Sequence, residues 1–147
     1  MNGNLPAEEA AILSRLVQQE IAGEPTPSRQ LNGAAAIVSA LACVLQNIIG
    51  GVATEATLRR AQVQAARKHP WLGNVVVTNC TLAPTLPEVE IESGDPETSR
   101  GALVALIEEW FGVLRWLLGT TCLPLLREAE AELRSSRLPR PSDEDGQ

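Results

Sequence analysis

Few side chains in this chain of 147 residues could do chemistry. His69 is the only histidine, which excludes metal and catalytic sites that need two imidazoles. A nucleophilic cysteine needs a base beside it, and His69 is the only imidazole that could serve Cys80. Nothing in their spacing brings the two together, so Cys80 is more simply a small buried side chain and His69 a residue at a helix end. A pocket near Cys80 and His69, for a small-molecule sensor or an enzyme, is an alternative hypothesis.

Carboxylates alternate with apolar residues at Glu88, Glu90 and Glu92. On a strand they would share one face, and three aligned carboxylates can hold a divalent cation. Such a row is more often a solvated face that discourages edge pairing. The sequence contains no phosphate-binding glycine motif, zinc-ligand spacing or nucleophile elbow. We therefore predict no metal site, no cofactor and no catalytic residue, which favours a protein that is not an enzyme.

Composition and charge narrow the class of partner. The formal net charge of −6 argues against a nucleic-acid partner and against an anionic membrane surface. The three cysteines are far apart and include no CxxC pair, which is typical of a reducing compartment. The first twenty residues lack the pattern of a signal peptide, so we expect a cytoplasmic protein. All but one of the 12 basic residues are arginine, which favours a bacterial or phage origin.

The stretch 31–54 carries no charged residue. Its aliphatic side chains recur at helical spacing and form an apolar face wide enough for a core helix. Thr26 and Pro27 are typical of a helix start, and Gly50 with Gly51 of a helix end. We therefore predict a buried central helix over about 28–50, around which the rest of the chain folds.

The same stretch is long enough to span a bilayer. Gln46 and Asn47 would then lie in hydrocarbon without partners, which favours the buried helix. A membrane-inserted protein that uses 31–54 remains a second alternative.

Further amphipathic segments predict helices on both sides of the central one. The first runs from Pro6 towards Gly23, and another, with a thin apolar side, covers about 55–68. The longest covers about 99–119, capped by Thr98 or Ser99. A kink or restart is expected near Cys122–Pro124, before a charged helix that ends near 134.

The segment 74–92 has a different period. Two runs rich in β-branched or alternating residues, Asn74–Leu82 and Leu86–Glu92, are joined across 83–85 and predict a β-hairpin or an extended arm. A two-stranded ribbon is marginal by itself in water, so it must lie on the helices or pair with another chain.

The predicted fold class is mainly α: a four- to five-helix bundle around the helix at about 28–50, with a small β-hairpin or extended insertion at about 74–92. Residues 1–134 form a single helical domain, and 135–147 a disordered acidic tail.

The predicted function is that of a non-catalytic module for interaction or assembly, which binds itself as a homo-oligomer or binds another protein. It would self-associate through the ribbon or through the tryptophan-bearing long helix. Trp110 and Trp116 lie about 120° apart on a helix, so both cannot sit centrally in one narrow core stripe. Exposed aromatic side chains are common at interface hot spots. The candidate interface residues are Val89, Ile91, Trp110, Phe111 and Trp116.

Overall fold

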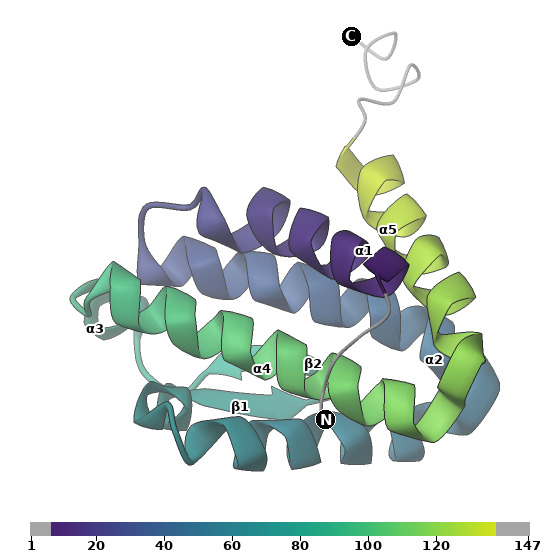
Figure 1. Ribbon diagram of the computed structural model, residues 1–147. Coiled ribbons are helices and arrows are strands. Elements are labelled where there is room, and N and C mark those ends of the chain that lie inside the picture. Colours follow the sequence, from purple (N-terminus) through teal and green to yellow (C-terminus); the bar gives the residue numbers. More distant parts are fainter. Residues whose placement is uncertain (1–6, 138–147) are drawn as a thin grey trace, which may run out of the picture.

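The computed structural model describes residues 7–137, in which helices predominate around one long helix, α2 (Figure 1). The elements in chain order are α1 (Ala7–Val17), the π-helical turn η1 (Gln18–Ala22), α2 (Pro27–Ala66), the 3-10 turn η2 (Pro70–Asn74), β1 (Val75–Thr78), β2 (Thr81–Pro84), α3 (Glu88–Glu92), α4 (Pro96–Leu118), η3 (Gly119–Thr121) and α5 (Cys122–Arg137). The predicted fold class is confirmed: the protein is mainly α, with four helices packed around α2 and a small antiparallel hairpin.

Helix α2 is bent sharply at Gly50, whose φ of 85° and ψ of 162° are not helical. A positive φ is easily adopted by glycine, which explains why the bend falls there. We call residues 27–49 the first arm and residues 51–66 the second arm; the two run in opposite directions (Figure 1). The predicted end of the central helix at Gly50 therefore marks the bend. Thr54 lies inside α2, where it is buried and its hydroxyl donates to the Gly50 carbonyl at 2.7 Å.

Two helix starts show how local sequence positions the core. The side chain of Thr26 accepts a hydrogen bond from the Arg29 N–H, as predicted for the start of α2. Helix α4 is capped by Asp95, rather than by Thr98 or Ser99, and its carboxylate accepts from the Thr98 N–H at 3.2 Å. Ser99 is instead fully buried and donates to the side chain of Gln30, which ties α4 to the first arm.

The first arm is the most enclosed part of the molecule. Helix α1, η1 and α5 pack along it on one side, and α4 runs between the two arms (Figure 1). The π-helical turn comes closest at Gly33, where an added Cβ would lie 1.7 Å from the Glu20 carbonyl oxygen. Arg15 of α1 donates two hydrogen bonds to the Glu130 carboxylate of α5, at 2.7 and 2.9 Å. Backbone contact and ion pairing together close this side.

The hairpin lies behind α4 in Figure 1, against both arms of α2. Strands β1 and β2 are joined by Asn79 and Cys80, which both have a positive φ, as a two-residue hairpin turn requires. Val75, Val77 and Leu82 are buried, so the helices cover its inner face.

The predicted second strand over 86–92 is wrong. Pro84 ends β2, and residues 88–92 form the short helix α3 directly after Pro87. Proline has no N–H to donate to a strand ladder, and Glu88 and Glu90 are favourable in the first turn of a helix. The ribbon is thus shorter than the predicted insertion.

The predicted disordered tail begins at 135, but α5 continues to Arg137. The remaining ten residues of the chain lie outside the described part. The described residues form one hydrophobic core. The single domain over 1–134 stays a prediction.

Candidate functional site: the groove between α2 and α4

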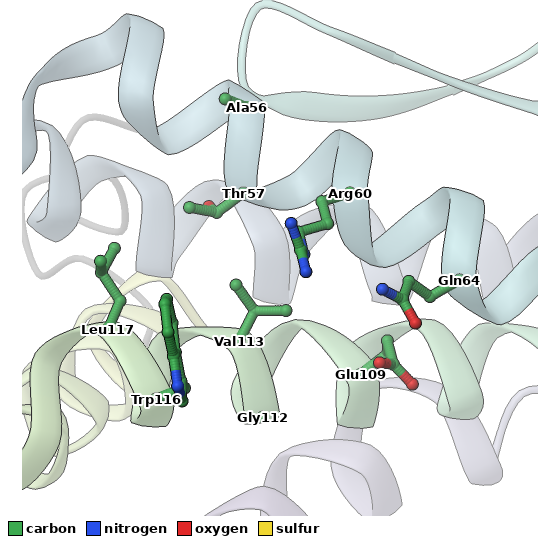
Figure 2. A pocket seen from close by; sticks show the side chains of 9 residues that line it. All are labelled: Ala56, Thr57, Arg60, Gln64, Glu109, Gly112, Val113, Trp116 and Leu117. Atoms are coloured by element: carbon green, nitrogen blue, oxygen red, sulfur yellow. The ribbon is translucent and has the colours of Figure 1, made fainter.

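A groove of about 660 Å³ lies between the second arm of α2 and the C-terminal half of α4 (Figure 2). One wall is formed by the second arm and the other by α4, and the two helices run antiparallel (Figure 1). The residues that line it are Ala56, Thr57, Arg60, Gln64, Glu109, Gly112, Val113, Trp116 and Leu117.

Trp110 holds the two walls together. Its side chain is fully buried, and its indole Nε1 donates to the Thr57 hydroxyl at 3.0 Å. Phe111, the next residue of α4, is also fully buried. The indole of Trp110 therefore fixes the separation of the two walls, and neither of the two buried aromatic rings can reach a partner.

The apolar end of the groove is unusually exposed. Trp116 is 84% exposed and Leu117 47% exposed, although both are large apolar side chains. Ala56 lies opposite them and also belongs to a second hollow, near the bend, that includes Val52. Val52 is 89% exposed. An apolar surface thus extends from α4 to the bend of α2, and such patches in folded proteins commonly mark binding sites.

The other end of the groove is polar. Figure 2 shows Leu117 and Trp116 at one end, Glu109 and Gln64 at the other, and Val113 and Arg60 between them. Within residues 7–137 no ion pair or side-chain hydrogen bond joins Arg60 or Glu109 to another residue. The groove therefore offers one unpaired base and one unpaired acid on opposite walls.

The structure divides the predicted interface residues into two groups. Ile91, Trp110 and Phe111 are buried inside the chain, so their side chains cannot form a surface. Val89, on α3, and Trp116 are exposed. Val89 and Ile91 do not share a strand face, because both belong to the short helix α3. Of the five, only Trp116 lines the groove.

Sequence reasoning missed Arg60, Glu109, Gly112 and Val113 as parts of a site. The signal was available on α4, where Glu109, Gly112 and Trp116 follow one another at helical spacing and share a face. No sequence pattern identifies the residues on the opposite wall, because the bend at Gly50 sets the position of the second arm.

Cys80 and His69 are not brought together. The Cys80 thiol is buried and donates to the Gly51 carbonyl at 3.4 Å, and its N–H donates to a Glu55 side-chain oxygen at 3.2 Å. His69 lies at the other end of the second arm, where its N–H donates to the Ala65 carbonyl. Ten helical residues, about 15 Å, separate Glu55 from Ala65. No acid–base pair forms between the two predicted reactive residues.

Glu55 is held ionised at the bend of α2. Its pKa is lowered, mainly by the hydrogen bonds from Arg59 and then by the N–H of Cys80. The ionised carboxylate thereby helps to hold the hairpin turn on α2. This contact explains how the turn tolerates a non-glycine residue with a φ of 59° at Cys80.

The row of carboxylates predicted on a strand is not formed. Glu88, Glu90 and Glu92 lie in α3, where a step of two residues turns the side chain by about 200°. No group of three or more histidine, cysteine or acidic side chains in residues 7–137 is placed to hold a metal ion.

By length and composition alone, α2 could cross a membrane. Its most apolar window of 18 residues has a mean hydropathy of 1.9 and is 33% buried in the chain. The core helix of a soluble protein passes the same test, and the bend at Gly50 interrupts the uncharged stretch. The membrane alternative therefore gains only weak support.

Comparison of the chain with protein-family models, with curated proteins and with solved structures finds no match. No role is therefore transferred from a relative to any residue.

Proposed function

We propose that this chain is a non-catalytic assembly module that self-associates, and that the groove between the second arm of α2 and α4 is its binding surface. The observation that carries the proposal is the 84% exposure of Trp116 on the wall of that groove. Three cysteines without a disulfide bond and an acidic net charge support a cytoplasmic setting.

The energetic reason is the apolar area that Trp116 leaves in water. A tryptophan side chain has roughly 200 Å² to bury, which corresponds to roughly 4 kcal/mol of favourable transfer free energy. Leu117 and Val52 add to this area, and both are exposed. Trp110, six residues earlier on α4, shows that the chain can bury a tryptophan where its own core provides space. A partner that covers Trp116 would gain the transfer free energy of this exposed apolar area.

The test is light scattering on a size-exclusion column, without detergent, over a range of protein concentrations. We expect the wild type to form a defined oligomer that dissociates on dilution, and Trp116→Ala to remain a monomer. Val89→Ala is the matched control, because Val89 is similarly exposed but lies on α3, away from the groove. A wild type that is monomeric at every concentration would refute the proposal. Loss of association in Val89→Ala alone would move the interface to the segment after the hairpin.

A further inference from the structure

We infer that the groove is occupied by a second copy of this chain, related by a two-fold axis that runs along the groove. Helix α4 of each copy then packs on the second arm of α2 of the other. This inference rests on the proposed function and specifies its partner and its geometry. The reason lies in how polarity and charge are distributed along the groove.

The groove differs between its two ends. Trp116 and Leu117 occupy one end, and Glu109 and Gln64 occupy the other (Figure 2). Arg60 lies between the ends, on the wall opposite Glu109 (Figure 2). A groove with this polarity can meet its own copy in two ways, because the two-fold axis of such an interface lies either across the groove or along it.

An axis across the groove is unfavourable. It reverses the direction of the second groove, so the apolar end with Trp116 faces the end with Glu109. It also brings Arg60 close to Arg60 of the second copy, and like charges that meet at an interface oppose association. A tryptophan would then cover a carboxylate, which loses its hydration without gaining a partner.

With an axis along the groove, each end of the groove faces the same end of the groove in the second copy. Trp116 then packs against Ala56 of the second copy, apolar on apolar. Glu109 of the second copy then lies level with Gln64, and Arg60, one helical turn from Gln64, extends its long side chain towards that carboxylate (Figure 2). Symmetry makes this pair twice. Neither side chain has an ion pair within the described part of its own chain, so no existing contact has to be broken.

The same arrangement agrees with helix packing. Helix α4 and the second arm are antiparallel within one chain (Figure 1). Turning the pair about an axis parallel to the helices gives four helices in which every neighbour is antiparallel, the arrangement of a common four-helix bundle. Gly112 allows the helices of the two copies to approach each other closely, because no atom lies within 4 Å of the position that its Cβ would occupy.

Charge reversal tests this geometry. Arg60→Glu and Glu109→Arg are made singly and together, and the dimer dissociation constant is measured by sedimentation equilibrium. Each single change makes two pairs repulsive, so we expect the dissociation constant to rise roughly tenfold or more. The double variant restores both pairs with reversed sign and should return to within about threefold of the wild type.

Matched controls lie on α4 and directly after the end of α2. Glu108→Arg makes the same charge change on an exposed residue that is one helical step away from the groove wall, and Arg67→Glu does so on an exposed residue at the end of α2. Both should leave the dissociation constant within about threefold of the wild type. Thermal unfolding of every variant checks that the monomer remains folded.

The outcomes separate the inference from the proposed function. A neutral side chain at this position separates the two axes, because reversing the charge would only exchange one like-charged pair for another. Tighter association of Arg60→Gln would show that two arginines repel each other across the interface, which places the axis across the groove and overturns the inference. Dissociation by Trp116→Ala, with all charge variants like the wild type, would overturn the inference and leave the proposed function standing. A wild type that never associates would refute both.

Discussion

The two sides of α2 are packed in opposite ways, and two glycines show the difference. Gly33, on the first arm, touches the backbone of η1 so closely that an added Cβ would lie 1.7 Å from the Glu20 carbonyl oxygen. Gly112 faces the second arm across the groove, and nothing lies within 4 Å of its Cβ position. The chain therefore completes the closed side by itself and leaves the groove side open. We take the open side as the part of the fold that another molecule completes.

Two tryptophans on α4 repeat the contrast. Trp110 is fully buried and hydrogen-bonded to Thr57, whereas Trp116 is mostly exposed. Both residues belong to α4, and the helix is continuous through both. What differs is which neighbouring element lies over them. Exposure of Trp116 is thus a property of the tertiary structure, and substitutions on the two sides should differ in their effect on stability as the sides differ in packing.

The largest difference in the free energy of unfolding is expected between the alanine variants of the two tryptophans. Trp110→Ala should lower the free energy of unfolding by about 4 kcal/mol, because it empties the core and leaves the Thr57 hydroxyl without its donor. Trp116→Ala should change it by less than about 0.5 kcal/mol. Urea unfolding, at concentrations where the wild type is monomeric, measures both. Equal losses in the two variants would contradict the assignment of Trp116 to an open groove.

Substitution by alanine should change the stability of the monomer in opposite directions at the two glycines. Gly33→Ala should destabilise the monomer by about 3 kcal/mol, because two backbones must separate to admit one methyl group. Gly112→Ala should stabilise it by up to about 1 kcal/mol, because alanine favours the helix and the space is free. Thermal unfolding of the two variants beside the wild type decides this. A stable Gly33→Ala would mean that η1 and α2 do not touch.

A smaller effect is expected from the ion pair between α1 and α5. Hydrogen bonds from Arg15 lower the pKa of Glu130 below its ordinary value of 4.5. The pair therefore stabilises the fold above that pH, and its contribution is lost as the pH falls through the lowered pKa. Glu130→Gln should lose about 1 kcal/mol at neutral pH and approach the wild type in acid.

Glu97→Gln is the control for that experiment. Its partner Arg100 lies at 3.3 Å, but the Glu97 side chain is exposed and the pair lies within one helix. It should change the free energy of unfolding by less than about 0.5 kcal/mol at any pH. A pH-independent difference between Glu130→Gln and the wild type would argue against a structural role for the Arg15 pair.

The three thiols test the burial of their side chains without any change to the sequence. Cys43 is exposed on the first arm, whereas Cys80 and Cys122 are buried. Burial, with the nearby charge of Glu9, raises the pKa of Cys122 to about 11, so little thiolate forms at neutral pH. Alkylation followed by mass spectrometry should label Cys43 quickly and the other two only in denaturant. Rapid labelling of Cys80 would instead revive the hypothesis of a reactive pocket.

Local rules predicted much of the fold. The start of α2 at Thr26 and the break at Gly50 follow from capping and from backbone freedom, which depend on neighbouring residues alone. The strand predicted over 86–92 failed because alternation of Val89 and Ile91 with acids suits a strand, while Pro87 and the acids also suit a helix start. Alternation over so few residues does not distinguish the two.

The sequence by itself determined the helical class, a helix over the uncharged stretch that is interrupted at Gly50, and the scarcity of catalytic groups, because periodicity, glycine and residue type act locally. Only the tertiary structure decided which tryptophan is buried and which lines a groove. That outcome depends on the second arm of α2 folding back beside α4, and the contacts of α4 with it join residues about fifty positions apart, as Trp110 and Thr57 do. No local pattern encodes such a pairing.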